Sequence, residues 1–374
     1  MAARFPVSLS LAASIGLGGV AFGATTAFWQ EPDLASSTYP NLGQMAGPFA
    51  PTFGAYNIPE YVGAFDNRDW QIQLAFDTAS KGIPTGEPLE EYNIVRVSLT
   101  LTIESVVGTP LYDPTYDPQS TYPLVNRPAT DPTPGRPIEL FAAAFRNGYT
   151  GWDFSPTITP GPPLFGQAGE GYGPGVFGQG IRHVFPTDLV PGSGGSPRDV
   201  SNNLDEPNAG TGNHNPFDVT PLAIGTTDLL TPGSALTPGT ELTFEIDLSN
   251  PLILDYVREG LQKGELGFIV ATLLPAVGDP GGGLGGNYVR FYLRGNGPDS
   301  PAMTIEYLVG TPNDCPGDIN GDGNTDIDDF IILAGNFGTP SGATLAEGDL
   351  NGDGAVDIDD FIILAGDFGC DSGF

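Results

Sequence analysis

Glycine and proline make up about a quarter of this 374-residue chain, with 54 glycines and 37 prolines. Both residues destabilise the interior of a long helix, glycine through its backbone entropy and proline through its missing N–H group. A bundle of long helices is therefore excluded. Hydrophobic residues still account for 39% of the chain and aromatic residues for 10%, which is enough for a packed core. The composition favours an all-β domain with long turns.

Alternating apolar and polar residues support this fold class. The clearest alternation spans 95–103, where Val or a larger aliphatic residue occupies every second position. Further strands are predicted at 70–76, 138–145, 242–248, 266–273, 288–293 and 303–307. Such alternation indicates antiparallel sheets, and two of them packed together form a jelly-roll-like β-sandwich. Asn250 and Pro251 predict the start of one short helix, 251–260.

The N-terminus has the pattern of a secretory signal peptide, with Arg4, an apolar stretch and small residues up to Gly23. Pro6 and the absence of a basic flank make a membrane anchor the weaker interpretation. We therefore predict a signal peptide at 1–23, a β-sandwich domain at 24–311 and a separate module at 312–374. No later run of about 20 apolar residues occurs, so no transmembrane segment is expected in the mature chain.

The charge balance narrows the choice of partners. There are 45 acidic and 13 basic residues, and the formal net charge is −32. Nucleic-acid binding that is independent of sequence needs a Lys/Arg surface, so this charge excludes it. A cationic partner such as a metal ion fits the charge better.

A duplicated segment lies near the C-terminus. Residues 317–338 read GDINGDGNTDIDDFIILAGNFG, and 348–369 read GDLNGDGAVDIDDFIILAGDFG. The two copies differ at only four of 22 positions and are offset by 31 residues. Such identity indicates two copies of one small structural unit.

Each copy begins with the spacing of a calcium loop: side-chain ligands at positions 1, 3, 5, 9 and 12, a glycine at position 6 and a backbone carbonyl at position 7. The predicted ligands of the first loop are Asp318, Asn320, Asp322, Asn324 (backbone), Asp326 and Asp329. Those of the second loop are Asp349, Asn351, Asp353, Ala355 (backbone), Asp357 and Asp360. Oxygen ligands suit Ca²⁺, and the absence of His and Cys from the loops disfavours transition metals. We predict two calcium ions, because a merely acidic turn would not account for two nearly identical copies.

A short apolar helix is predicted after each loop. Two acidic residues favour the helix N-terminus, and a Phe-Ile-Ile-Leu segment follows them. Either helix alone is marginal in water. We therefore expect residues 330–333 to pack against 361–364 around a pseudo-twofold axis.

This tandem of loop and single helix resembles the type I dockerin over roughly residues 314–370. Thrombospondin-type calcium repeats are less similar, since they carry cysteines within each repeat and lack a long apolar helix. The resemblance implies docking to a cohesin, with contacts from loop positions 10 and 11: Ile327, Asp328, Ile358 and Asp359. Dockerins of cellulosomes frequently have Ser or Thr at these positions and Lys or Arg in the helix, whereas residues 313–374 contain no Lys or Arg. The partner is therefore a cohesin-like protein or another cell-surface receptor.

The two cysteines flank this module. Cys315 precedes the first loop and Cys370 follows the second repeat. In a pseudo-twofold tandem the two ends meet, so a disulfide between them is expected in an exported protein. Free thiols and intermolecular pairing are the alternatives.

The body carries no recognisable catalytic motif, and its catalytic residues stay unknown. Its strand order loosely resembles secreted β-sandwich domains of the DNRLRE type, which implies a structural or carbohydrate-associated role. Residues 154–216 form a predicted Gly/Pro-rich loop with both histidines, His183 and His214; a decorated surface loop or a metal or catalytic site both fit it. The tryptophans Trp29, Trp70 and Trp152 suit either core packing or stacking on sugar rings.

The sequence thus predicts a secreted calcium-binding protein whose C-terminal module docks or anchors a β-sandwich outside the cell. One alternative is an extracellular glycoside hydrolase that degrades polysaccharides with carboxylates in the sandwich loops, since such an enzyme needs only two suitably spaced carboxylates. Another is a purely structural component of a surface layer. Polysaccharide is a second candidate partner under the first two interpretations.

Overall fold

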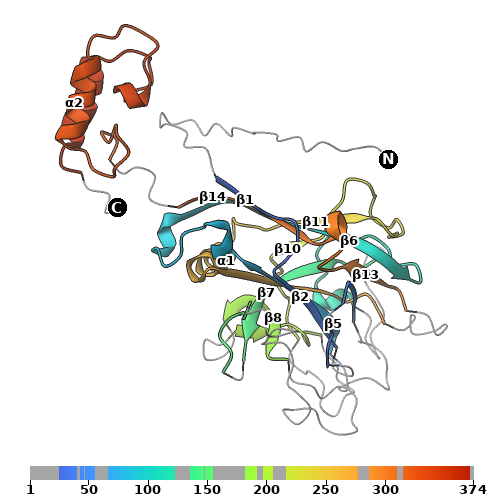
Figure 1. Cartoon of the computed structure of the whole chain (residues 1–374). Helices are drawn as coiled ribbons and strands as arrows, with labels where there is room; N and C mark the ends of the chain where they lie inside the picture. The colour runs from blue at the N-terminus through green and yellow to red at the C-terminus, as the bar shows by residue number, and fades with distance from the viewer. Residues whose placement is uncertain are drawn as a thin grey trace. The chain divides into compact units, whose positions relative to one another are not determined.

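The computed structural model describes residues 25–39, 43–45, 47–54, 66–122, 135–146, 148–154, 182–191, 197–204, 216–276, 286–309 and 315–370. The predicted signal peptide and His214 lie outside these residues. Two compact units are present (Figure 1). We call Thr26–Tyr307 the β-rich unit and residues 315–370, which belong to the second unit, the C-terminal module.

Within the described residues, the β-rich unit contains fourteen strands. Their hydrogen-bonded order is β1-β14-β6-β13-β4-β5-β12-β7-β8-β9, with β2, β3, β10 and β11 joined to it from the side. Their bounds are β1 Thr25–Trp29, β2 Leu34–Tyr39, β3 Gly43–Met45, β4 Phe49–Gly54, β5 Arg68–Asp77, β6 Tyr92–Val107, β7 Ile138–Phe145, β8 Val184–Pro191, β9 Pro197–Asp199, β10 Ala223–Ile224, β11 Glu241–Glu245, β12 Glu265–Thr272, β13 Tyr288–Tyr292 and β14 Ala302–Val309. Short 3₁₀ turns occur at Ala79–Lys81, Leu89–Glu91, Gln119–Thr121 and Gly297–Asp299. The strand pairs whose register is described are antiparallel, for example β11 with β6 and β12 with β5.

Strand β4 joins two groups of strands. Its first half pairs with β13, and its last residues pair with β5. One group is centred on β6 and the other on β5, β12 and β7. The predicted fold class, mainly antiparallel β followed by a small helical pair, is confirmed.

Apolar side chains of the two groups meet in the core. Trp29 on β1 lies edge-on to Phe76 on β5, with ring centroids 6.0 Å apart, and Phe76 lies 6.2 Å from Phe268 on β12. Along β6 the alternate residues from Val97 to Ile103 are buried, as predicted, but Val95 is exposed at the strand's beginning. The alternation therefore placed the core face of β6 correctly except at this end.

Helix α1, Pro251–Lys263, has the N-cap predicted for it, because the Asn250 side chain accepts a hydrogen bond from Leu252 N. Its buried residues Ile253, Val257 and Leu261 follow helical spacing. The hydroxyl of Tyr256 donates to Gly267 O and accepts from Ala143 N. The helix is thereby fixed to β12 and β7.

The segment 154–216 differs from the prediction. It contains β8, which pairs with β7, and the short strand β9. His183 is buried just before β8, with its ring 4.7 Å from that of Tyr149. The described part of this segment is thus partly an extension of the sheet rather than a loop throughout.

The tryptophans serve packing within the β-rich unit. Trp29 is buried, and Trp70 contacts Phe53 with ring centroids 5.4 Å apart. Trp152 lies over Gly267, where an added Cβ would come within 2.2 Å of the indole nitrogen. Their surroundings favour the core-packing interpretation over sugar stacking.

The C-terminal module contains helices α2, Ile327–Asn336, and α3, Ile358–Asp367, with a 3₁₀ turn at Leu345–Glu347 between the repeats. Ile319, Leu333, Val356 and Leu364 form its buried cluster. The rings of Phe330 and Phe361 contact one another across the two helices at 6.2 Å. Each helix ends one residue beyond a glycine, Gly335 in α2 and Gly366 in α3.

Candidate calcium centre

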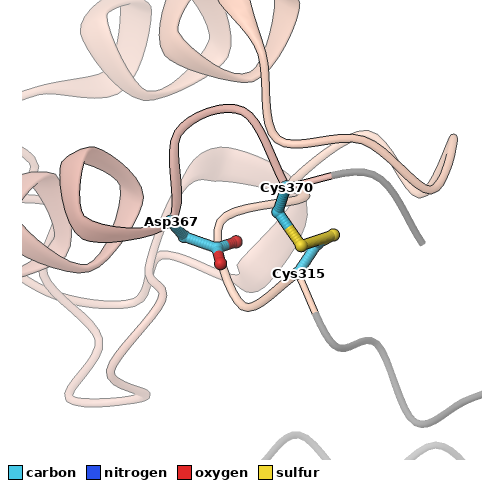
Figure 2. A group of neighbouring side chains, drawn as sticks. All are labelled: Cys315, Asp367 and Cys370. Atoms are coloured by element: carbon cyan, nitrogen blue, oxygen red, sulfur yellow. A yellow bond between two sulfur atoms is a disulfide. The ribbon is translucent and has the colours of Figure 1, made fainter.

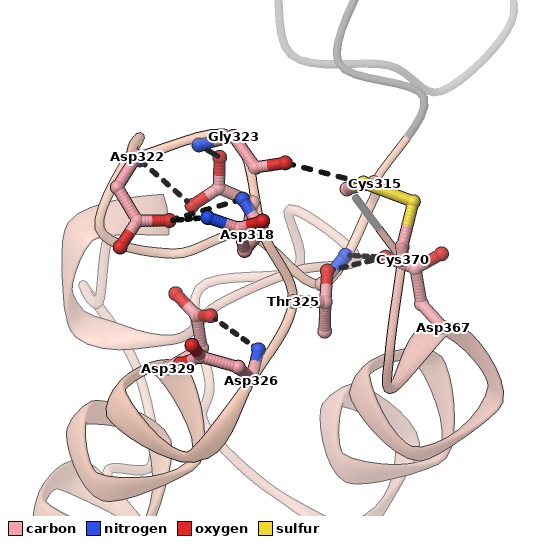
Figure 3. Close-up of a disulfide and its surroundings, with 11 residues drawn as sticks. Cys315, Asp318, Asp322, Gly323, Thr325, Asp326, Asp329, Asp367 and Cys370 are labelled. Atoms are coloured by element: carbon pink, nitrogen blue, oxygen red, sulfur yellow. Dashed lines mark hydrogen bonds between the residues drawn. A yellow bond between two sulfur atoms is a disulfide. The ribbon is translucent and has the colours of Figure 1, made fainter. Parts of the chain in front are cut away.

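The first residue of each loop organises the turn that follows it. The carboxylate of Asp318 accepts hydrogen bonds from Gly321 N at 2.7 Å, Asp322 N at 3.2 Å and Gly323 N at 2.9 Å (Figure 3). Gly323, at loop position 6, has a φ of +89°, a left-handed conformation that favours glycine. The backbone thus wraps around a carboxylate that is only 4% exposed.

The last ligand position ties the loop's end to its beginning. Asp329 is fully buried, and one of its oxygens accepts from Ile319 N at 2.8 Å and Asn320 N at 3.0 Å. The other oxygen accepts from Asp326 N at 2.9 Å, and Asp326 in turn caps helix α2. One carboxylate therefore serves the loop and the helix start together.

The middle ligands lie closer to solvent. The Asn320 amide donates to Asp322 at 3.0 Å, and this contact lowers the pKa of the Asp322 carboxyl. Asp322 also accepts from Asn324 N at 3.0 Å. The residues predicted at positions 1 to 7 therefore lie along one tight turn.

The second loop repeats this geometry. Asp349 accepts from Gly352 N, Asp353 N and Gly354 N at 2.9, 3.2 and 2.9 Å. Asp360 accepts from Leu350 N, Asn351 N and Asp357 N at 2.8, 3.1 and 2.8 Å. Asp357 caps α3 as Asp326 caps α2. The sequence repeat is thus a structural repeat at the level of single hydrogen bonds.

The charge of the loops fits a calcium ion. Each loop holds four carboxylates, and the first and last of them are buried. Residues 313–374 contain no Lys or Arg to compensate them. A carboxylate offers about four acceptor positions, so the backbone N–H groups leave oxygen lone pairs for a cation. The donors are all oxygens, which is the ligand chemistry of Ca²⁺.

Each loop also forms backbone hydrogen bonds with the end of the other repeat. Thr325 N, at position 8 of the first loop, donates to Cys370 O at 3.0 Å, and Gly369 N donates to Thr325 O at 2.8 Å. In the second loop Val356 N donates to Thr339 O at 2.9 Å, and Gly338 N donates to Val356 O at 2.8 Å. This crossed pairing is the pseudo-twofold relation expected from the sequence.

Part of the expected helix packing is absent. Leu333 and Leu364 are buried, but Ile331 and Ile362 are 61% and 60% exposed. These two isoleucines therefore do not pack between the helices, as the sequence suggested they would. The reason is helical geometry: one apolar stripe covers the module's core, and residues off that stripe face outwards.

The outward apolar residues gather in two equivalent sets. We call them the apolar faces of the module: Ile327, Ile331 and Phe337 from the first repeat, and Ile358, Ile362 and Phe368 from the second, each at least half exposed. Ile327 and Ile358 are two of the four residues predicted to contact a partner. The other two, Asp328 and Asp359, are also exposed and lie beside them. Sequence reasoning missed Ile331, Ile362 and the two phenylalanines by assigning the former to the core and the latter no role.

Cys315 and Cys370 form a disulfide. One oxygen of Asp367 and the two sulfur atoms lie within 4.8 Å of one another (Figure 2). The sulfurs are bonded to each other and are therefore not available as thiolate ligands.

Buried charges in the β-rich unit are engaged in structure. Arg68 donates to Glu139 through Nε at 2.8 Å and Nη2 at 3.1 Å, and both side chains are buried. Burial raises the pKa of Glu139, and the Arg68 guanidinium opposes this rise. Asp199, in the segment for which a catalytic or metal site is one interpretation, pairs with Arg146.

Two loops of oxygen ligands, each followed by one short helix and cross-paired with the other, define a tandem calcium-binding module. Residues 316–368 match the family model of the Dockerin type I domain. The C-terminal module is a type I dockerin domain, and domains of this kind bind calcium and dock to cohesins.

The match covers only this module. No curated protein and no solved structure matches the chain significantly. Among the described residues, no helix combines the length and apolar character needed to cross a membrane.

Proposed function

We propose that this chain is an exported protein whose dockerin domain binds two calcium ions and thereby docks the β-rich unit to a cohesin-like partner outside the cell. In this proposal residues 1–23 are the signal peptide, residues 24–311 are the β-sandwich domain that is docked, and residues 312–374 are the docking module. Dockerin-containing proteins are typically extracellular or attached to the cell surface, which supports this placement.

The observation that carries the proposal is the pairing of two acidic loops with two apolar faces in one module. The loops contain buried carboxylates without any basic residue to neutralise them. The helices that present the apolar faces begin at the last loop residues. A cation that orders each loop therefore also orders the helix that contacts the partner.

Calorimetric titration of the full chain should find two calcium ions. Asp318→Ala should remove one ion and Asp349→Ala the other, because each deletes the carboxylate around which its loop turns. Asp328→Asn is the matched control: it removes an exposed acidic charge next to the first loop's ligands but no predicted ligand, and should leave two ions bound. Two ions retained by the Asp318→Ala, Asp349→Ala double variant would refute the ligand assignment.

The apolar faces should carry partner binding. The probe is a set of recombinant type I cohesin modules, tested against the full chain in calcium by biosensor. For a cohesin that binds, Ile331→Asp with Ile362→Asp should weaken affinity at least about tenfold, since buried apolar anchors dominate interface energies. Both residues are exposed, so calcium binding should not change.

Leu229→Asp is the control for this experiment, because Leu229 is an exposed aliphatic residue of the β-rich unit. It should leave cohesin affinity unaltered. Unchanged affinity in the double isoleucine variant would place the docking surface elsewhere on the module.

For the β-rich unit we propose a structural or carbohydrate-associated role, supported by its loose resemblance to DNRLRE-type sandwiches. Binding of the full chain to a polysaccharide array would support the carbohydrate-associated form. Release of reducing ends from the same polysaccharides would instead favour the glycoside hydrolase alternative.

A further inference from the structure

The two calcium loops are held in place by different parts of the chain. Position 8 of the second loop, Val356, pairs with Thr339, and Ala343 N donates to Gly354 O at 2.9 Å. Thr339 and Ala343 both lie in the segment between α2 and α3. That segment is continuous with helices on both sides and cannot separate from the module.

Position 8 of the first loop depends on the C-terminal end instead. Thr325 pairs through its backbone with Cys370 and Gly369, which follow the last helix. Among the described residues no further element of the module follows Gly369 and Cys370, so other contacts must hold them in place. Here the tie is the Cys315–Cys370 disulfide, since Cys315 lies just before the first loop and Asp318 N donates to Cys315 O at 2.9 Å.

A second tie comes from Asp367, the last residue of α3. One of its oxygens accepts from Gly317 N at 2.7 Å and from the Thr325 hydroxyl at 2.6 Å. Gly317 immediately precedes the first loop and Thr325 lies inside it, next to Asp326 (Figure 3). Asp367 therefore holds both the entrance and the middle of the first loop.

The residues of this contact are specific to one half of the module. Thr325 and Asp367 occupy two of the four positions at which the repeats differ; their counterparts are Val356 and Asn336. Val356 has no hydroxyl, and the Asn336 amide donates to Ile332 O within its own helix. The equivalent link is thus absent between these two counterparts.

From these contacts we infer that Asp367 and the Cys315–Cys370 disulfide are positioning elements of the first calcium site alone, so that the two sites of the module respond differently to reduction. This inference rests on the proposed binding of one calcium ion per loop. Asp367 does not contact the ion in this scheme; it fixes the backbone from which the ligands project. Breaking either tie lowers calcium affinity in the first loop and leaves the second loop unaffected.

The test measures each loop separately by calorimetry of the full chain. Asp349→Ala leaves the first site and Asp318→Ala leaves the second. In the Asp349→Ala variant, the further changes Cys315→Ser and Cys370→Ser should lower the calcium affinity of the first site by roughly fivefold or more, the ordinary range for coupled sites. In the Asp318→Ala variant, the same two serine substitutions should change the calcium affinity of the second site less than about twofold.

Asp367 is tested with the disulfide intact. Asp367→Ala should weaken only the first site, whereas Asn336→Ala, at the same position of the other repeat, should weaken neither. Asp367→Asn keeps an acceptor oxygen but removes the charge, so it should restore most of the affinity if Asp367 acts by position. Failure of Asp367→Asn to restore affinity would show a purely electrostatic effect and refute the positioning role.

Linkage requires the reverse effect as well. Dithiothreitol reduces the disulfide by two-electron thiol exchange, giving the Cys315 and Cys370 thiols and cyclic oxidised dithiothreitol. At a fixed ratio of reduced to oxidised dithiothreitol, calcium should therefore shift the equilibrium towards the disulfide in the Asp349→Ala variant but not in Asp318→Ala. An equal shift in both variants, or equal loss of affinity at both sites, would overturn the inference. If the unsubstituted chain binds no calcium, the proposed function itself fails.

Discussion

Replacing Arg68 by methionine should lower the free energy of unfolding of the β-rich unit by about 3–5 kcal/mol, because it leaves one member of a buried ion pair uncompensated. Glu139, the other member, is 1% exposed. Arg68 also donates to Val200 O at 3.0 Å and to the side-chain oxygen of Asn203. The substitution thus removes the partner of three buried acceptors at once.

Urea unfolding followed by tryptophan fluorescence will measure this effect cleanly. All three tryptophans lie in the β-rich unit, and the C-terminal module has none. Arg96→Met is the matched control, since the side chain of Arg96 is 44% exposed where it pairs with Glu245. An exposed ion pair contributes at most about 1 kcal/mol, so a similar loss in both variants would contradict the argument.

The loss in free energy of unfolding caused by Arg68→Met should also depend on pH. Without the guanidinium, burial alone acts on Glu139 and raises its pKa in the folded state above that in the unfolded chain. Folding then binds a proton, so the carboxyl's stabilising contribution is present in acid and is lost as pH rises through the folded pKa. The variant should therefore be closest to the unsubstituted protein at acidic pH and furthest from it at neutral pH.

Alternation identified seven of the described strands and missed, among others, β2, in which most of the buried residues are polar. Strand β2 buries Ser36, Ser37 and Thr38, which no hydrophobic pattern reveals. Thr38 is accommodated because Gln73 on β5 donates to its hydroxyl at 2.7 Å. Such strands become recognisable only when the partner strand is known.

Strand β8 was missed because it contains two prolines. Pro186 and Pro191 lie within it, and proline normally argues against a strand in the middle of a sheet. Pro186 is the residue paired with Ala143 on β7, while the short strand β9 covers only part of β8's other edge. The surrounding Gly/Pro-rich composition then made the whole of 154–216 resemble a loop.

The calcium loops were predictable residue by residue because their ligands are local in sequence. Every contact that shapes the turn around Asp318 comes from within five residues. The links between Thr325 and Asp367 and between Thr325 and Cys370 span more than 40 residues and needed the fold. The only sequence signal for these links was that Thr325 and Asp367 are two of the four positions at which the repeats differ. Their meaning could not be recognised without knowing that the two residues face each other.

Removing calcium with EDTA should abolish the ordered structure of both α2 and α3 while leaving the β-rich unit intact. Without cations, four carboxylates per loop repel one another in a module that contains no basic residue. A ligand present at a hundred times its dissociation constant contributes about 2.7 kcal/mol per site, so two sites contribute roughly 5 kcal/mol in total. The module's small buried cluster has little else to offset that loss.

Hydrogen exchange of the full chain, read by mass spectrometry, separates the two units. Peptides covering Ile327–Asn336 and Ile358–Asp367 should lose protection in EDTA and regain it with excess calcium, while peptides from β5 and β12 keep theirs. The Asp318→Ala, Asp349→Ala double variant should match the EDTA state even in calcium. The Cys315–Cys370 disulfide does not require calcium and persists in EDTA, so no disulfide has to form again when calcium is added. Helices that keep full protection in EDTA would mean that their cluster folds without the ions, and the docking surface would then not be calcium-dependent.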